Sequence, residues 1–250
     1  MDRPRSPARH TRLFPSWPFP AGNAYVWVAV ADDHLDNLDV LECMLSREER
    51  ERAARIRRGR DRWIVGRALL RLVLGGCLGR EPRSIEFRLG PNAKPELAPD
   101  EGEPPPHFNL SHSGRLVLIA VADAPVGVDV ERIRELDLAG MARQVFRPDE
   151  AAALNGIPAA RRTEAFIAAW TRKEAYLKAR GLGIGGMRGV AVDVNPDEPA
   201  RLLGADDSDI RRWTLVDLAV EPGYRAALAV LGRPNVFRRS WDRTDTSPRG

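Results

Sequence analysis

Two segments decide the fold and the chemistry expected of this chain: Gly127-Val128-Asp129-Val130-Glu131 and, about forty residues later, Trp170-Thr171-Arg172-Lys173-Glu174-Ala175-Tyr176-Leu177-Lys178. Together they supply three carboxylates and two lysines. Carboxylate oxygens suit a magnesium ion, and lysine ammonium groups suit phosphate. The two segments could therefore hold a magnesium ion and a polyphosphate, although neither segment alone identifies a function.

The first segment has the pattern of a strand. Because successive side chains of a strand point to opposite faces, Val128 and Val130 are expected to face the core. Gly127, Asp129 and Glu131 then share the other face, where the glycine leaves space beside two carboxylates that suit a hard cation. The alternative is a solvated strand edge with two acids, and Asp-x-Glu on its own favours that alternative.

The second segment is predicted to lie on a helix over residues 161–180 that ends at Gly181, since glycine is favoured just past a helix end. Trp170, Glu174 and Lys178 are spaced i, i+4, i+8 and so lie along one stripe. The alternative is an ordinary Glu–Lys pair worth about a few tenths of a kcal/mol. The tryptophan on the same stripe argues against a face that is simply exposed.

Two further features could contact phosphate. Ser111 and His112 lie in the run Phe108-Asn109-Leu110-Ser111-His112-Ser113, where a hydroxyl and an imidazole can contact a phosphate or a nucleobase. A structural, hydrogen-bonded histidine is the alternative. Residues 52–62 carry six arginines against one acid, and arginine is well suited to phosphate recognition. A solvated helical face is the alternative there.

The composition is that of a soluble globular protein: the 250 residues are 43% hydrophobic and 30% charged. Apolar runs such as residues 116–122 are too short to span a bilayer, and the N-terminus lacks the apolar region of a secretory signal. Cys43 and Cys77 have no metal-ligand spacing, so a reduced, cytoplasmic protein is expected. The formal net charge of +4 favours an anionic partner: nucleic acid, a phosphorylated small molecule or an acidic protein.

Strands and helices mix without strict βαβ alternation, so an α+β fold is predicted. Strands are expected at residues 24–30, 85–89, 116–122, 126–130, 213–220 and 224–231. Helices are expected in one long segment from the capping-box residue Ser46 to about residue 78, and at 138–145, 149–155 and 161–180. The remaining stretches are predicted to be an irregular arm at 1–22, a loop at 90–106 and a disordered tail at 233–250.

In this order and spacing, residues 108–114, 127–131 and 170–178 resemble the surfactin-synthetase-activating type of 4′-phosphopantetheinyl transferase, and the resemblance covers residues 45–230. It implies an enzyme that transfers the 4′-phosphopantetheine arm of coenzyme A to a serine of an apo acyl or peptidyl carrier protein. The reaction releases adenosine 3′,5′-bisphosphate and needs Mg²⁺.

The same resemblance implies how the chain is organised. The α+β fold would consist of two similar subdomains, residues 23–122 and 123–232, related by pseudo-twofold symmetry, with coenzyme A in the cleft between them. It also implies a monomer that meets its carrier protein transiently, has neither a nucleic-acid nor a membrane partner, and acts in secondary metabolite biosynthesis.

The resemblance assigns magnesium binding to three acids, Asp129, Glu131 and Glu174. It assigns catalytic roles to Glu174, Lys178 and Asp129: Glu174 is the candidate base for the carrier serine, and Lys178 contacts the coenzyme A phosphates. Whether Glu174 is a base or only a metal ligand stays open. Coenzyme A binding is assigned to six residues, of which the first needs a short alignment gap: Arg52, Arg62, Lys94, Ser111, His112 and Lys178.

Two other functions remain as alternatives. A nucleic-acid-binding protein would use residues 52–62 and would bind with a steep salt dependence, but the three acids would repel a phosphate backbone unless they held a metal. A catalytically silent module that binds coenzyme A or a carrier protein would not need all three acids, and all three are present.

Overall fold

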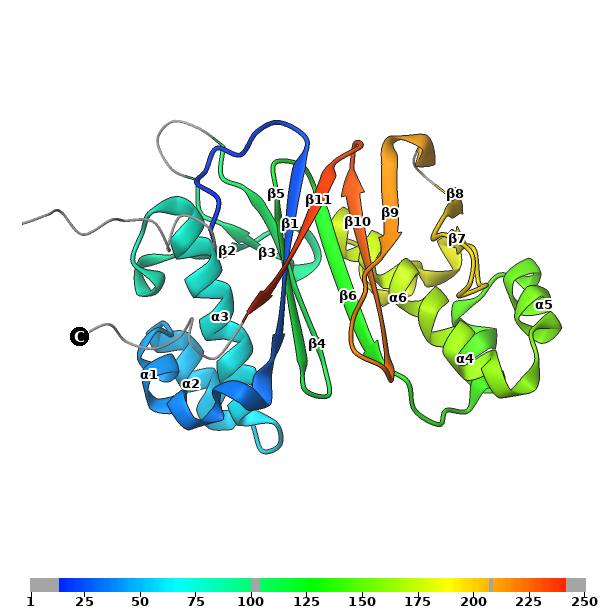
Figure 1. Cartoon of the computed structure of the whole chain (residues 1–250), viewed down its shortest axis with the longest axis horizontal. Helices are drawn as coiled ribbons and strands as arrows, with labels where there is room; N and C mark the ends of the chain where they lie inside the picture. The colour runs from blue at the N-terminus through cyan, green and yellow to red at the C-terminus, as the bar shows by residue number, and fades with distance from the viewer. Residues whose placement is uncertain (1–13, 100–103, 207–208, 242–250) are drawn as a thin grey trace, which may run out of the picture.

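The computed structural model describes residues 14–99, 104–206 and 209–241. These residues form two halves that lie side by side, each a β-sheet with helices on its outer face (Figure 1). Helices α1 to α3 cover the sheet of the first half, and α4 to α6 cover the sheet of the second. The two sheets meet in the middle of the molecule, so the chain has the α+β fold that the sequence predicts.

The first half contains a four-stranded sheet with the order β11-β1-β5-β4. Its strands are β1 (Asn23–Val30), β4 (His107–Ser113), β5 (Leu116–Ala122) and β11 (Asn235–Trp241). Three helices follow β1, namely α1 (Leu38–Cys43), α2 (Arg47–Arg55) and α3 (Arg60–Leu78). A small hairpin of β2 (Phe87–Leu89) and β3 (Pro95–Leu97) then leads into β4.

The second half contains a three-stranded sheet with the order β6-β10-β9. Its strands are β6 (Val126–Arg132), β9 (Trp213–Asp217) and β10 (Tyr224–Leu231). Three helices follow β6, namely α4 (Leu138–Val145), α5 (Pro148–Gly156) and α6 (Arg162–Arg180). A small hairpin of β7 (Val190–Val192) and β8 (Leu202–Ala205) then leads towards β9.

The two halves repeat one plan: a strand, three helices, a small hairpin and two strands. The pairing repeats as well, because β1-β5-β4 and β6-β10-β9 are both antiparallel. The third helix is 19 residues long in each half and ends at a glycine with a left-handed backbone, Gly79 (φ 64°) and Gly181 (φ 66°). This repeat is the pseudo-twofold arrangement expected from the sequence. No helix in the described ranges is long and apolar enough to cross a membrane.

Each half also locks its second helix to its third through a buried glutamate. Ser46 caps α2 as predicted, and Glu49 of that capping box accepts a hydrogen bond from Arg71 of α3 at 2.5 Å. The corresponding glutamate of α5, Glu150, accepts one from Lys173 of α6 at 2.5 Å. Because a carboxylate near a helix N-terminus also compensates the helix dipole, one side chain satisfies the cap and the buried cation.

The apolar core has three layers: one under the helices of the first half, one under the helices of the second half, and one between the two sheets. Strands β5 and β6 show how side chains are divided among them. Alternate residues of β5 enter the layer under α3 and the layer between the sheets, so that all seven of its residues are buried. On β6, Val126, Val128 and Val130 enter the layer between the sheets. The prediction that Val128 and Val130 face the core is therefore confirmed. The opposite face of β6 is left to Gly127, Asp129 and Glu131.

The structure corrects three expectations for the first half. The single helical segment from Ser46 to about residue 78 is broken after Arg55, and α3 starts at Arg60. Gly59 adopts φ 75° at the break, and the arginine-rich turn around it offers no apolar side chain to the core. The expected loop at 90–106 contains β3, which pairs with β2.

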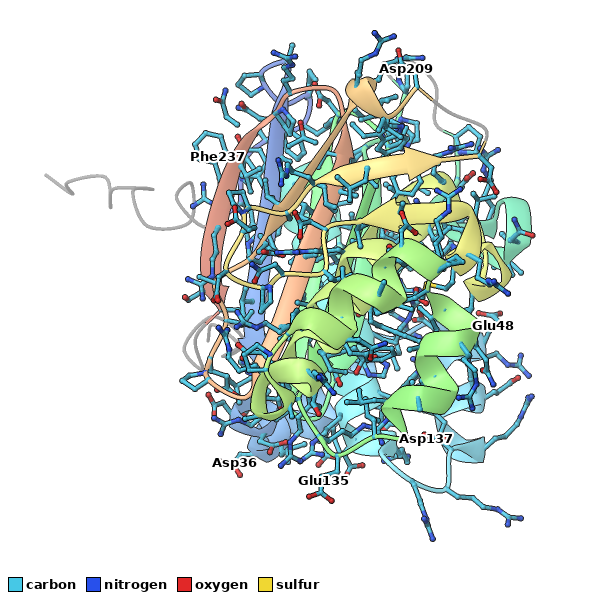
Figure 2. All side chains as sticks on the ribbon, turned by 90° about the vertical axis from the view of Figure 1, so that its right-hand side faces the viewer. Asp36, Glu48, Glu135, Asp137, Asp209 and Phe237 are labelled. Atoms are coloured by element: carbon cyan, nitrogen blue, oxygen red, sulfur yellow. The ribbon has the colours of Figure 1, made fainter. Side chains whose placement is uncertain are left out.

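The third correction concerns the expected disordered tail, because Asn235–Trp241 forms β11, parallel to β1. Phe237, labelled at the edge of the molecule in Figure 2, stacks on Tyr25 at 5.1 Å, and Trp241 is buried. Residues 242–250 lie outside the described residues. Of the predicted irregular arm, residues 14–22 contain no helix or strand, but Phe19 is buried in the core of the first half. Residues 1–13 lie outside the described residues.

Replacing Arg172 tests how the second half is held together. This side chain is fully buried on α6; it donates to the main-chain oxygens of Asp193 (2.7 Å), Asn195 (3.0 Å) and Glu198 (2.9 Å) and pairs with Asp217. Arg172→Met leaves these acceptors without their charged donor, so we expect the free energy of unfolding to fall by about 3 kcal/mol. Urea denaturation would measure the change.

The matched control is Arg201→Met, which removes an exposed arginine that pairs with Asp193 of the same loop. An exposed pair contributes about 0–1 kcal/mol. Equal losses for the two variants would contradict the structural role given to Arg172.

Candidate active site

Strands β4 and β6 are neighbours at the junction of the halves, although they belong to different sheets. The two strands are not joined by a main-chain ladder. Instead, the side chain of every second residue of β4 binds the edge of β6. Three side-chain acceptors receive main-chain N–H groups: Asn109 from Val128 (2.9 Å), Ser111 from Val130 (3.3 Å) and Ser113 from Arg132 (3.1 Å). We call Asn109, Ser111 and Ser113 the edge row. It satisfies strand-edge donors that would otherwise need water or another strand.

Two members of the edge row also bind the acids of β6. The Ser111 hydroxyl donates to Asp129 Oδ1 at 2.8 Å, and the Ser113 hydroxyl donates to Glu131 Oε2 at 2.7 Å. Each serine therefore accepts from one N–H group of β6 and donates to the carboxylate of the preceding residue. Both acids are thus held on the side of β6 that faces β4.

Helix α6 packs against the face of β6 that carries Gly127, Asp129 and Glu131, and it comes closest at Gly127. A Cβ atom there would lie 2.1 Å from the Ala175 oxygen and 2.3 Å from the Ala179 nitrogen, so only glycine lets the helix backbone come this close. The sequence suggested that Gly127 leaves space for a cation, but the structure fills that space with α6. The consequence for the site is that Glu174 and Lys178 lie directly over the strand.

Lys178 and Asp129 form an ion pair at the centre of this arrangement. The Lys178 ammonium donates to Asp129 Oδ1 at 2.6 Å and to the Ser111 hydroxyl at 3.1 Å. The Asp129 side chain is only 4% exposed, and its Oδ2 is buried with no hydrogen-bond partner among the described residues. Burial raises the pKa of Asp129, and the charge of Lys178 opposes that shift.

The third acid, Glu174, shares this electrostatic environment. Burial raises its pKa; Lys178 opposes the shift, and the carboxylates of Asp129 and Glu131 add to it. The three predicted acids therefore influence one another's charge and share one electrostatic environment. Within the described residues, however, no three acidic, histidine or cysteine side chains already have the geometry of a formed metal site.

Two further residues named from the sequence, His112 and Lys94, belong to segments other than β6. His112 follows Ser111 on β4 and is exposed; desolvation lowers its pKa, and the charge of Lys178 lowers it further. Lys94 lies beside the start of β6, where its ammonium donates to the Val126 and Ala179 oxygens at 3.2 and 3.3 Å. Burial lowers the pKa of Lys94 to about 8. This lysine lines a pocket of about 410 Å³.

The two arginines named from the sequence lie on the helices of the first half. Arg62, on α3, makes a two-bond ion pair with Asp32 at 2.7 and 3.0 Å. Arg52, on α2, lies 5.6 Å above the Trp63 ring. None of the interactions described for these arginines reaches an acid of β6 or α6. The structure thus gathers Ser111, His112 and Lys178 around the acids but places the arginines elsewhere.

Sequence reasoning missed Asn109 and Ser113 as site residues. Both lie in the run that contains Ser111 and His112, and their contacts repeat those of Ser111 at two-residue spacing. The signal was present, because polar residues at every second position of a strand share one face. What the sequence did not contain was the neighbour that this face meets.

Two family models match the chain. Residues 32–124 match the N-terminal model of 4′-phosphopantetheinyl transferases, and residues 125–229 match the 4′-phosphopantetheinyl transferase superfamily.

Similar proteins carry the same name. HetI, a 4′-phosphopantetheinyl transferase of Nostoc sp., is 36% identical over 83% of this chain and 87% of its own length. The transferase psf-1 of Bacillus pumilus is 36% identical over 76% of this chain and 81% of its own length. The transferase Sfp of Bacillus subtilis is 32% identical over 56% of this chain and 62% of its own length. The resemblance drawn from the sequence motifs is confirmed, and the chain belongs to the 4′-phosphopantetheinyl transferase superfamily.

Proposed function

We propose that this protein transfers the 4′-phosphopantetheine arm of coenzyme A to a serine hydroxyl of an apo acyl or peptidyl carrier protein, and that the reaction takes place where β4, β6 and α6 meet. One observation carries the proposal. Asp129, Glu131 and Glu174 share one electrostatic environment with the ammonium of Lys178, inside a chain that belongs to this transferase superfamily. Phosphoryl transfer depends mainly on positioning and on neutralising charge, and these residues supply both.

The bond changes follow from the substrates. The serine oxygen attacks the β-phosphorus of coenzyme A, and the bond from that phosphorus to adenosine 3′,5′-bisphosphate breaks. Glu174 takes the serine proton in this proposal. A positioned general base contributes about 10²–10⁴-fold to the rate.

Three acids are proposed to hold a magnesium ion: Asp129, Glu131 and Glu174. Their oxygen donors suit this cation, and Asp129 presents a buried Oδ2 that has no hydrogen-bond partner among the described residues. When bound, Mg²⁺ neutralises charge on the pyrophosphate oxygens. The Lys178 ammonium already lies against Asp129, so it is placed to contact the pyrophosphate once it leaves that carboxylate.

The remaining proposed coenzyme A ligands are Arg52, Arg62, Lys94, Ser111 and His112. Lys94 lines the pocket at the start of β6 and is proposed to hold a phosphate near the nucleotide. The Ser111 hydroxyl has one proton and two lone pairs, which Asp129, Val130 and Lys178 occupy. It can therefore accept no additional donor unless Lys178 moves, and to donate to a phosphate it must release Asp129.

Two observations favour this reading over nucleic-acid binding. Arg60 of the arginine-rich segment is occupied by an ion pair with Glu42, which leaves less charge for a phosphate backbone. The acids of β6 and α6 would repel such a backbone. We also propose that the protein acts as a cytoplasmic monomer and that its carrier partner binds transiently.

Intact-mass spectrometry tests the function directly. An apo carrier protein incubated with this protein, coenzyme A and Mg²⁺ is expected to gain about 340 Da, the mass of the arm that this transfer adds. The gain should disappear when a chelator removes the metal. No mass gain across fatty acid, polyketide and peptide carriers would contradict the proposed function.

Asp129→Asn tests the role of the central acid. The amide keeps the shape of the side chain but lacks the charge, so we expect the rate of arm transfer to fall by at least about 100-fold with little change in melting temperature. The control is Asp209→Asn, at the exposed edge labelled in Figure 2. Near-normal transfer by Asp129→Asn would remove Asp129 from the site.

The pKa of Lys94 predicts how coenzyme A binding depends on pH. Above about pH 8 the free protein loses this positive charge, so coenzyme A must bind together with a proton. The affinity should therefore fall with rising pH, by up to about tenfold per unit above that pKa. Calorimetric titration between about pH 7 and 9.5 would measure it. Lys94→Arg stays charged over this range, and an unchanged pH dependence in that variant would contradict the role of Lys94.

A further inference from the structure

We infer that Ser113 is a positioning residue for the transfer reaction, because its hydroxyl decides which way the Glu131 carboxylate points. This inference rests on the proposed function, in which Glu131 is one of the three magnesium ligands. Ser113 itself need not touch coenzyme A, the carrier protein or the metal.

The contacts of Ser113 connect β4 to the end of β6. Its hydroxyl donates to Glu131 Oε2 at 2.7 Å and accepts from the Arg132 N–H group at 3.1 Å. A hydrogen bond to a charged carboxylate is stronger than one between neutral groups. The same hydroxyl thus fixes the main chain of β6 and the side chain that the strand carries.

Glu131 has a competing partner on its other side. Strand β10 pairs with β6 so that Arg225 lies directly opposite Glu131. Opposite charges at such cross-strand positions attract each other. The Arg225 side chain already pairs with Glu164 of α6, yet its Nε is buried with no hydrogen-bond partner among the described residues. A Glu131 side chain released from Ser113 would therefore find an unused donor on the β10 side.

The direction of Glu131 matters because Asp129 is held from the β4 side by Ser111. Ser113 holds Glu131 from that same side, so both carboxylates are bound by serines of β4. A Glu131 side chain that turned towards Arg225 would move away from Asp129. It would then form an ion pair with the arginine instead of offering its carboxylate to a metal ion. Ser113 thus favours metal binding by excluding a competing salt bridge.

Ser113 is also the cleaner of the two serines to test. The hydroxyl of Ser111 accepts from Lys178 as well, so its removal would disturb a proposed catalytic residue. The side-chain hydrogen bonds described for Ser113 join only Glu131 and Arg132 of β6. A change at Ser113 therefore reports on Glu131 without acting on Lys178.

The experiment measures Mn²⁺ binding by electron paramagnetic resonance, with Mn²⁺ titrated into protein that is saturated with coenzyme A and free of carrier protein. Groups that orient metal ligands typically affect metal affinity by about 10–100-fold, so we expect Ser113→Ala to raise the Mn²⁺ dissociation constant by about tenfold. Transfer assays should show the same shift in the Mg²⁺ concentration needed for half the maximal rate, with the maximal rate largely recovered at high Mg²⁺.

Two variants separate positioning from general structure. Ser113→Thr keeps the hydroxyl on a residue that strands favour, and it should restore wild-type Mn²⁺ affinity. Ser84→Ala removes an exposed serine hydroxyl that donates locally to the main-chain oxygen of Glu81, and it should leave Mn²⁺ affinity unchanged. A purely structural role for Ser113 would instead lower the melting temperature and leave Mn²⁺ affinity unchanged.

The outcomes distinguish this inference from the function beneath it. If wild-type protein transfers the arm but Ser113→Ala binds Mn²⁺ as tightly as wild type, the inference is wrong and the proposed function stands. If wild-type protein transfers no arm to any carrier, the proposed function fails and the inference fails with it.

Discussion

The arrangement of this protein depends on how the edge of β6 is satisfied. A strand edge presents unpaired N–H groups, and the usual solution is a main-chain ladder with the next strand. Here the edge row of Asn109, Ser111 and Ser113 binds those groups with side chains. A main-chain ladder would bring the backbones of β4 and β6 together and would leave no room for side chains between them. Side chains hold the two sheets one side-chain length apart and place hydroxyl groups beside the acids of β6.

The second constraint is the close contact between β6 and α6 at Gly127. It carries Glu174 and Lys178 to the strand that already holds Asp129, so that two buried carboxylates lie beside one partly exposed cation. Burial and mutual repulsion make these carboxylates costly in the free protein. Another cation would stabilise a site with this balance of charge, which supports the proposed role of these residues in phosphate transfer.

The sequence predicted what depends on local pattern. The alternation of Val128, Asp129 and Val130 predicted which side chains of β6 face the core. The i, i+4 spacing of Glu174 and Lys178 predicted that these two side chains lie on one face of a helix. It did not predict β11, because Asn235–Trp241 is polar and its partner β1 lies at the other end of the sequence. Likewise, the value of Ser113 depends on a strand of the other half. Contacts between segments that lie far apart in the sequence leave little trace in the pattern of either segment.

The parallel pairing of β11 with β1 has a consequence for biosynthesis. Strand β1 leaves the ribosome before every other strand that the structure describes, and β11 leaves after all of them. Until then one edge of β1, rich in buried apolar residues, stays open to pairing with other chains. Most of the first half is thus synthesised before the second half, but its sheet is completed only when β11 pairs with β1. The time needed to translate the second half is therefore the time during which this edge of β1 can pair with other chains.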